Sequence, residues 1–522
     1  MPVPAVTAVP AATAATAITP VTPAARSASP PQPALTAQPA LAQRLRAHLQ
    51  ALEHGLLERE AAARLLLLAA LAGEHVLLIG PPGTAKSELA RRLHRAFAGA
   101  RYFERLLTRF STPEELFGPL SLKALEDDRY ERLIDGYLPT AGIAFLDEVF
   151  KANSAILNAL LTLLNEREYD NGAARLRTPL ISVIGASNEA PADESLLAFH
   201  DRFLLRVPVA AVGDAAFAAL LQLDDAATTA ADLPAPLSPA ERAQVLAARN
   251  TVALGDTALA ALGRLRQHCG SLGLVVSDRR WRQLVALMRC AAASEGRLSL
   301  DDLDLWLAPF VVASDPAAVP GIATWLTREV VQALPQDLPW LDHAVTAFEK
   351  QLELEQSLSA DPEEASAAAA AADHQAGKLA LARSIGGAEA ATQADSAGQQ
   401  GLLRLRAAGL EARRRRAFSP VHVAARLAQV AALAARAAAA RASVLAAHDS
   451  LAARLASRLW LPPTLARAWL DAHQQTLATL ARQQARLAAT QAGFAAHPID
   501  PGLDGPAPAP ISEADLDTDT AA

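Results

Sequence analysis

The segment that most restricts the fold of this chain is a glycine-rich run placed between an apolar stretch and a helical pattern. The apolar stretch covers residues 75–79, and residues 87–97 carry apolar side chains at helical spacing. A loop that binds phosphate needs backbone N–H groups that converge on the anion at the start of a helix, a lysine that reaches the phosphate oxygens and a hydroxyl for Mg²⁺. The intervening sequence supplies these parts in the order Gly80-Pro81-Pro82-Gly83-Thr84-Ala85-Lys86-Ser87, followed by Glu88. The run therefore predicts a binding loop for ATP, with Ser87 on Mg²⁺.

Position 85 departs from the usual spacing of such loops. The pattern G-x-x-x-x-G-K-[ST] places glycine there, whereas this chain has Ala85, the smallest residue with a side chain. We interpret the departure as mild, because Gly83 and the flanking strand and helix patterns are intact. The alternative for the segment taken alone is an ordinary Pro-Gly turn.

A second motif follows the next apolar stretch. Residues 143–146 predict a buried strand, which ends in the acidic pair Asp147 and Glu148. Hydrolysis of a nucleotide requires one carboxylate that orients the Mg²⁺ shell and a second group that positions or deprotonates the attacking water. We assign Asp147 to the metal and Glu148 to the water. An acidic pair alone is more often a solvated turn, but the two motifs together predict nucleotide hydrolysis.

Two further polar residues are candidates whose roles are left open by spacing alone. Asn188 follows an apolar stretch at residues 180–186 and could reach the water or the γ-phosphate, but it could equally form a turn before Pro191. Arg202, beside Asp201, could place a guanidinium on the charge of the transition state. The alternative for Arg202 is a structural ion pair.

The order of these patterns predicts the fold class. Strand, loop, helix and strand in succession are typical of a parallel α/β core. A helical stretch at residues 155–164 and the turn signal Asp170-Asn171-Gly172 predict a helix and a hairpin before the strand at 180–184. Beyond Val209 the pattern becomes helical. We therefore predict an α/β P-loop core whose parallel sheet is sandwiched by helices, an all-α lid and a further C-terminal helical domain.

Changes in composition predict the domain boundaries. The first 40 residues are rich in Pro, Ala and Thr, and the stretch from about 359 to 420 has low complexity. Apolar residues recur at helical spacing on both sides of that stretch, which predicts a helical bundle. The expected divisions are a disordered arm at 1–40, the α/β core at 41–212, the lid at 213–330, a helical domain at 331–500 that contains the low-complexity insertion, and a disordered acidic tail at 501–522.

Bulk properties narrow the classes of function. With 51% hydrophobic and only 4% aromatic residues, the 522-residue chain favours helices and has material for several domains. A formal net charge of -7 argues against nucleic acid as a general partner. Cys269 and Cys290 are too few for a disulfide framework or a thiolate metal site. The apolar runs are shorter than the ~20 residues of a membrane span, so we expect a soluble, cytoplasmic protein.

Over residues 45–330 the chain resembles the MoxR family of AAA+ ATPases, and in particular its RavA branch. In that branch a β-rich module interrupts the C-terminal helices, whereas the corresponding stretch here is rich in alanine and has no strand pattern. Besides the phosphate loop, the likeness is carried by Glu115-Leu116-Phe117-Gly118-Pro119-Leu120, Leu146-Asp147-Glu148-Val149-Phe150-Lys151-Ala152-Asn153-Ser154 and Gly185-Ala186-Ser187-Asn188-Glu189.

The resemblance implies roles for individual residues. By likeness to the family, Asn188 becomes the sensor 1 residue and Arg202 the arginine finger that acts on a neighbouring subunit. Arg279 becomes the sensor 2 residue that contacts the nucleotide, with the adjacent Arg280 as the alternative.

The resemblance also implies an assembly and a role. Residues 118–138 would hold the helix 2 insert of this clade, and residues 167–179 the pre-sensor hairpin. A finger that acts between subunits implies a ring, and the family forms hexamers. Its members resemble chaperones that remodel or mature client proteins, commonly with a partner that carries a von Willebrand factor A domain.

Two other functions share parts of this pattern. A metal-chelatase or enzyme-activase subunit has the same insert-bearing AAA+ architecture and differs mainly in its client. A nucleic-acid-acting AAA+ motor belongs to another class and would need a basic pore or an appended reader domain, neither of which is evident in the sequence. The four arginines at 413–416 could touch phosphates, but such a run is more often a solvated helix or linker.

Overall fold

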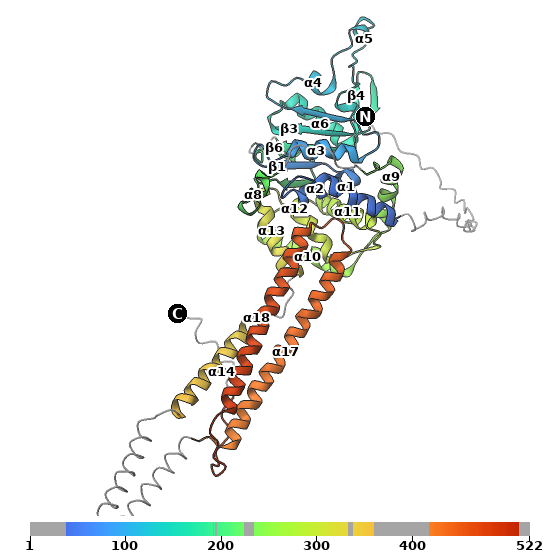
Figure 1. Cartoon of the computed structure of the whole chain (residues 1–522). Coiled ribbons are helices and arrows are strands. Elements are labelled where there is room, and N and C mark those ends of the chain that lie inside the picture. The colour runs from blue at the N-terminus through green and yellow to red at the C-terminus, as the bar shows by residue number, and fades with distance from the viewer. Residues whose placement is uncertain are drawn as a thin grey trace, which may run out of the picture.

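A head that contains a β-sheet carries a stalk of long helices, which projects from one side of it (Figure 1). The computed structural model describes residues 38–191, 193, 196–223, 234–331, 338–359 and 417–510. The expected N-terminal arm up to residue 37, the expected insertion from 360 to 416 with its four arginines, and residues 511–522 lie outside the described residues.

The head is built on a five-stranded sheet in which every neighbouring pair of strands is parallel. The strand order is β2-β3-β6-β1-β7. All carboxyl ends therefore meet at one edge, here called the carboxyl edge, where ligands bind in open α/β sheets. The opposite edge is called the amino edge. The predicted parallel α/β core is confirmed. The strands are β1 (Val76–Ile79), β2 (Tyr102–Leu106), β3 (Ile143–Asp147), β6 (Ser182–Ser187) and β7 (Leu205–Pro208).

Helices cover both faces of this sheet, as the side chains of β1 require. Val76 and Leu78 pack on one face, and Leu77 and Ile79 pack on the other. Because both faces are covered, every residue of β1 is buried. The helices on the first face are α1 (Gln38–Glu53), α2 (Glu60–Ala72) and α3 (Lys86–Leu93), and those on the second are α6 (Ser154–Glu166) and α7 (Leu197–His200).

Two excursions extend the head away from the stalk (Figure 1). The first covers residues 118–138, in which Leu120 pairs antiparallel with Arg132. The second is an antiparallel hairpin within residues 167–179. Asn171 fastens the two together, because its Oδ1 accepts from the Arg132 N–H at 2.7 Å and its Nδ2 donates to the Arg132 carbonyl at 3.1 Å. The elements of this region are α4 (Pro113–Phe117), α5 (Leu122–Glu126), β4 (Glu168–Asn171) and β5 (Ala174–Arg177).

A helical lid follows the sheet, after the short helix α8 (Asp214–Leu221). Arg206, buried in β7, donates to the Ala313 carbonyl at 2.8 Å and so joins the sheet to the lid. Cys269 and Cys290 are buried free thiols within the lid. The predicted all-α lid is confirmed, apart from a pair of two-residue strands. Its elements are α9 (Pro239–Ala248), β8 (Ala253–Leu254), α10 (Asp256–Ser271), α11 (Asp278–Ser294), β9 (Ser299–Leu300), η8 (Asp302–Leu307), α12 (Ala308–Val312) and α13 (Val319–Leu326).

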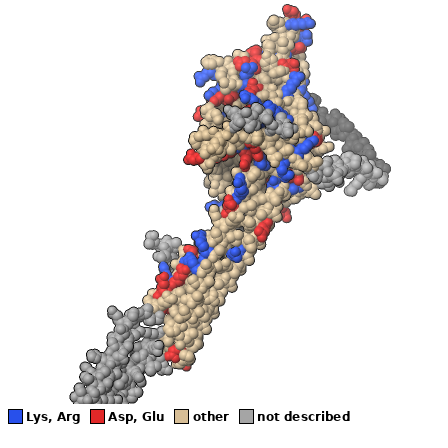
Figure 2. All heavy atoms as spheres, in the orientation of Figure 1, with Lys and Arg blue, Asp and Glu red and all other residues tan. Residues whose placement is uncertain are grey.

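Three helices form the stalk, which confirms the predicted C-terminal helical domain. Val345, Val430 and Leu480 are fully buried where the three helices meet. On the side shown in Figure 2, charges of both signs are interspersed over the head, whereas the stalk carries long uncharged stretches. The stalk helices are α14 (Leu338–Ser359), α17 (Pro420–Ala456) and α18 (Pro463–Ala495).

The stretch that follows α18 continues along the stalk. Arg426 of α17 donates to the Ala509 carbonyl at 3.2 Å, and the Asp500 N–H donates to the Phe418 carbonyl at 3.1 Å. Residues 501–510, expected to be part of a disordered tail, are therefore described in the structure and contact α17 at Ala509. Their proline-rich sequence has no helix or strand period that predicts this contact.

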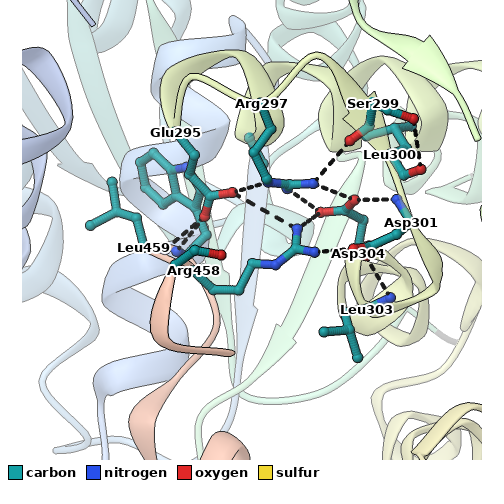
Figure 3. Close-up of polar contacts among 12 residues, drawn as sticks. Glu295, Arg297, Ser299, Leu300, Asp301, Leu303, Asp304, Arg458 and Leu459 are labelled. Atoms are coloured by element: carbon teal, nitrogen blue, oxygen red, sulfur yellow. Dashed lines mark hydrogen bonds and ion pairs between the residues drawn. The ribbon is translucent and has the colours of Figure 1, made fainter. Parts of the chain in front are cut away.

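A network of ion pairs fixes the base of the stalk to the lid (Figure 3). Arg458, between α17 and α18, donates to Asp304 Oδ1 at 2.9 Å and also pairs with Asp301. The carboxylate of Glu295 accepts from the Leu459 N–H at 2.7 Å. Charge-assisted hydrogen bonds of this kind are stronger than neutral ones, so the junction is firm.

One described helix, α17, is long and apolar enough to cross a membrane by length and composition alone, with a mean hydropathy of 1.4 over its most apolar window. In this structure the helix packs in the stalk. Arg426 donates to Glu355 Oε1 at 3.1 Å, and the guanidinium of Arg436 lies 3.8 Å from the ring centre of Trp340.

Candidate active site

The phosphate loop joins β1 to α3 at the carboxyl edge of the sheet. At Gly80 an added Cβ would come within 2.0 Å of the Val209 carbonyl oxygen, so only glycine fits there. Gly83 has a φ of 77° and Ala85 a φ of 64°, both in the left-handed region. The departure at position 85 thus falls where the backbone favours glycine, and Ala85 adopts the same turn under strain.

Lys86 begins α3 and is buried, with 7% of its surface exposed. Its Nζ donates to the carbonyl oxygens of Gly80 and Pro81 at 2.7 and 2.9 Å, so the side chain folds back over the loop. Burial lowers the pKa of this ammonium, whereas the charges of Asp147 and Glu148 raise it. The cation lies beside the first turn of α3, whose N–H groups are oriented to bind an anion.

The strands β3 and β6 lie side by side and bring the acidic pair next to Asn188. Asn188 Nδ2 donates to Glu148 Oε1 at 2.7 Å, and the ammonium of Lys151 lies 3.2 Å from Glu148 Oε2. The Glu148 N–H donates to Asp147 Oδ1 at 3.0 Å. Glu148 has a φ of 51°, a strained conformation for a residue with a side chain, and strain of this kind often occurs at functional sites.

The residues at this edge fit ATP and Mg²⁺. Mg²⁺ prefers oxygen ligands, and the Ser87 hydroxyl and the Asp147 carboxylate supply them. Lys86 and the N-terminus of α3 suit the phosphates. Thr84 Oγ1 donates to the Pro81 carbonyl at 2.9 Å and stiffens the loop.

Two further residues of the predicted site are Glu88, on α3, and Pro82, in the loop. Glu88 Oε1 accepts from Arg92 Nε at 2.8 Å, so this carboxylate pairs within its own helix. Pro82 is exposed to solvent at the tip of the loop.

The structure places the predicted arginine finger at the amino edge. Arg202 lies between α7 and β7, so it approaches the sheet from the side opposite Lys86. The neighbouring Arg280 is buried and donates to Asp201 Oδ1 at 2.8 Å and to the Leu204 carbonyl at 2.7 Å. Arg280 therefore holds the lid against the segment that leads into β7.

Arg279 also lies at the amino edge, in the first turn of α11. Its positive charge acts on Glu74, which precedes β1. Gln283, one turn further along α11, donates to Glu74 Oε2 at 3.3 Å. Within one chain, therefore, Arg279 is not brought to the phosphate loop, and its sensor 2 role stays a prediction.

Two residues beside the loop were not predicted from the sequence. Arg59 Nε donates to the Thr84 carbonyl at 3.0 Å, and its Nη2 donates to the Ala210 carbonyl at 2.7 Å. Glu58, whose φ is 56°, accepts from the Gly213 N–H at 2.9 Å. The pair joins the loop to the segment that follows β7. The only signal in the sequence is a polar pair before an apolar helix, which more often marks a helix start.

Comparison with known proteins matches both parts of the head. Residues 43–235 match the family described as the MoxR domain in the MoxR-vWA-beta-propeller ternary systems, and residues 257–326 match the AAA lid domain. The chain belongs to the MoxR family of AAA+ ATPases. The phosphate loop, the acidic pair and Asn188 of this MoxR-family protein lie in the first matched segment, and Arg279 lies in the second.

Three relatives share this region. An uncharacterized protein of Methanocaldococcus jannaschii is 42% identical over 253 residues, which cover 48% of this chain and 65% of the relative. A second uncharacterized protein of that organism is 41% identical over 264 residues, which cover 50% of this chain and 69% of the relative. Protein MoxR of Paracoccus denitrificans is 33% identical over 153 residues, which cover 28% of this chain and 44% of that protein. The chain thus spans about two thirds or less of the length of these relatives.

Proposed function

We propose that this MoxR-family protein binds ATP with Mg²⁺ and hydrolyses it. The observation that carries the proposal is the convergence of Lys86, Asp147, Glu148 and Asn188 at the carboxyl edge. The acidic pair acts on the charge of Lys86, and Asn188 is hydrogen-bonded to Glu148. Three separate segments supply these groups, and the fold gathers them beside a loop shaped for phosphate.

Each group has a part in the transfer of the γ-phosphoryl group to water. Lys86 and the N–H groups of α3 neutralise charge on the phosphates. Ser87 and Asp147 hold Mg²⁺, which supplies further charge stabilisation when bound. Glu148 orients the attacking water and accepts its proton, and Asn188 holds the Glu148 carboxylate in place.

We place Arg202 in the active site of a neighbouring subunit of a ring. Its position at the amino edge keeps it from the loop of its own chain. A head-to-tail contact brings the amino edge of one copy to the carboxyl edge of the next, and repetition of that contact closes a ring, which we propose to be a hexamer.

We further propose that the ring remodels or matures a client protein, together with a partner that carries a von Willebrand factor A domain. The description of the matching family, which names MoxR-vWA-beta-propeller ternary systems, supports the partner. A RavA-like branch is supported by stalk helices on both sides of residues 360–416. The buried free thiols Cys269 and Cys290 support a cytoplasmic location.

Turnover of ATP per subunit, measured against protein concentration, tests the shared site. We expect specific activity to rise with concentration, and Glu148→Gln and Arg202→Ala each to abolish turnover while ATP still binds. The exposed Arg264→Ala is the matched control. Mixing the two inactive variants should restore part of the turnover. In the mixture, Arg202 of a Glu148→Gln copy can complete the active site of a neighbouring Arg202→Ala copy, which still has Glu148.

The turnover assay and a trapping experiment together separate the alternatives. Turnover that is independent of concentration and of Arg202 contradicts the ring. Strong stimulation by nucleic acid would favour a nucleic-acid-acting motor. Capture of a chelatase or an enzyme by a Glu148→Gln trap would instead favour the metal-chelatase or enzyme-activase class.

A further inference from the structure

The short helix α8 presents an apolar surface that the described chain leaves uncovered. It buries none of its residues, and Phe217 and Leu221 are 54% and 71% exposed. An isolated helix of this length is not stable in water, and tertiary packing of an apolar face normally supplies the stability. The helix α8 therefore needs a surface that covers its apolar side chains.

A second apolar patch lies on the loop between α10 and α11, at residues 272–276. Leu272 is 53% exposed and Val275 is 98% exposed. The loop ends at Ser277, whose hydroxyl caps α11 by accepting from the Arg280 N–H at 3.4 Å. The loop is therefore fixed to the same helix turn that presents Arg279.

The two patches lie at opposite edges of the sheet. The helix α8 follows the carboxyl end of β7, and Glu58 holds its start through the Gly213 N–H. The loop 272–276 precedes α11, whose Arg280 holds Leu204 at the amino end of β7. A surface at each edge is what a head-to-tail contact between copies needs, since such a contact joins two different patches.

We propose that α8 of one copy of this chain is covered by the loop 272–276 of a second copy. The inference rests on the proposed ring and names its contact surfaces. A second copy is the occupant. Its amino edge carries Arg202 and Arg279 beside the loop 272–276, and the phosphate loop of the first copy has no such arginines from its own chain. Docking of the loop on α8 sets these arginines against that phosphate loop.

The contact is linked to the nucleotide through Arg59. Its guanidinium bridges the Thr84 carbonyl of the phosphate loop and the Ala210 carbonyl, three residues before Gly213, the N-cap of α8. Any change in the phosphate loop on nucleotide binding would therefore reach the segment that precedes α8 through Arg59. Arg59 acts here as a positioning residue, and Arg59→Ala should weaken the effect of ATP on assembly while it leaves assembly without nucleotide intact.

Charged substitutions on each patch test the contact. Phe217→Asp and Val275→Asp both change exposed side chains, so the fold should tolerate them. We expect each variant alone to sediment as a monomer and to lose at least about tenfold of its ATP turnover, with ATP binding retained. The matched control is Leu259→Asp on α10, whose leucine is 56% exposed and belongs to neither patch.

Mixing the two variants gives the decisive result. The Phe217→Asp copy keeps an intact loop, and the Val275→Asp copy keeps an intact α8, so the mixture should form a dimer and regain part of the turnover. A cross-link between a Phe217→Cys copy and a Val275→Cys copy, formed only on mixing, would locate the contact, because the native cysteines are buried.

The outcomes separate this inference from the proposed function. If the unaltered chain assembles and needs Arg202 while both variants assemble like the control, the ring stands and this contact is wrong. If only Phe217→Asp dissociates, α8 meets a surface other than the loop 272–276. If the unaltered chain shows no dependence on concentration or on Arg202, the proposed ring fails, and the contact fails with it.

Discussion

Asn188, directly after β6, donates a hydrogen bond of 2.7 Å to Oε1 of Glu148, directly after the neighbouring strand β3. The other carboxylate oxygen lies 3.2 Å from the ammonium of Lys151. Both oxygens of the proposed base are therefore held before any water is in place, and an oriented base is more effective than a mobile one.

Replacement of Asn188 should uncouple catalysis from binding. We expect Asn188→Ala to lower kcat by about a hundredfold, because the Glu148 carboxylate loses one of its two tethers. The affinity for ATP should change little. Single-turnover kinetics with a direct binding measurement checks both, and the exposed neighbour Glu189→Gln serves as control. A parallel loss of affinity would show that the amide holds the bound nucleotide and not the base.

Glycine at position 85 should stabilise the head. The φ of Ala85 is 64°, and relief of the left-handed strain by Ala85→Gly should raise the free energy of unfolding by about 1 kcal/mol. The opposite effect, a loss of about 1 kcal/mol, is expected for Ala260→Gly in the exposed face of α10. Urea unfolding compares the two variants. Equal destabilisation by both would mean that the strain is absent.

Stability of the head should fall in mild acid because of His75. Its Nδ1 accepts from the Val183 N–H at 2.9 Å and its Nε2 lies 3.2 Å from the Leu164 carbonyl, so the ring has no place for a second proton. Burial, aided by the charge of Arg167, lowers the pKa of His75 from 6.5 to about 3.

The sign of this effect follows from proton binding. The pKa of His75 is about 3 in the folded chain and 6.5 in the unfolded chain. Between these values only the unfolded chain binds the proton, so the free energy of unfolding falls as the pH drops below about 6.5. At pH 5 the loss from this group is about 2 kcal/mol. Urea unfolding at pH 7 and at pH 5 measures it. His75→Gln should be less stable at pH 7 but should lose less on acidification, and an identical pH slope would contradict the assignment.

Loss of Arg458 should loosen the stalk. In Arg458→Ala the buried carboxylate of Asp304 keeps Arg297 but loses its second partner, and such a loss costs about 1–3 kcal/mol. Denaturant unfolding followed at the stalk measures the change. Arg467→Ala, an exposed arginine of α18, should change stability by less than about 1 kcal/mol. A similar small effect at Arg458 would show that the network contributes no net stability.

The parts of the site that were predictable are those written in consecutive residues. The loop from Gly80 to Ser87 and the pair Asp147-Glu148 carry their chemistry in a fixed order. An apolar stretch before each motif predicts the strand that leads into it. The contact between Asn188 and Glu148 depends on β3 and β6 being neighbours in the sheet. Strand order is a property of the packed core, so spacing in the sequence could not supply that contact.

Two strands of the five-stranded sheet were not predicted, for a physical reason. Both β2 and β7 are edge strands with a single neighbour. In β2, Glu104 pairs with Arg91 at 2.9 Å on a partly exposed face. In β7, Arg206 is buried and joins the sheet to the lid. Charged residues interrupt the apolar pattern by which β1, β3 and β6 were recognised.

The anchored base of the stalk has a mechanical consequence. Besides the lid network, Thr464 Oγ1 at the start of α18 donates to Glu60 of α2 at 3.1 Å, so the stalk is tied to the head at two places and must turn with it. The 37 residues of α17 form a lever arm of about 55 Å, and a head rotation of about 10° would sweep its far end through about 10 Å. In the proposed nucleotide cycle, small movements of the head would thereby become displacements as large as a helix is wide at the far end of α17.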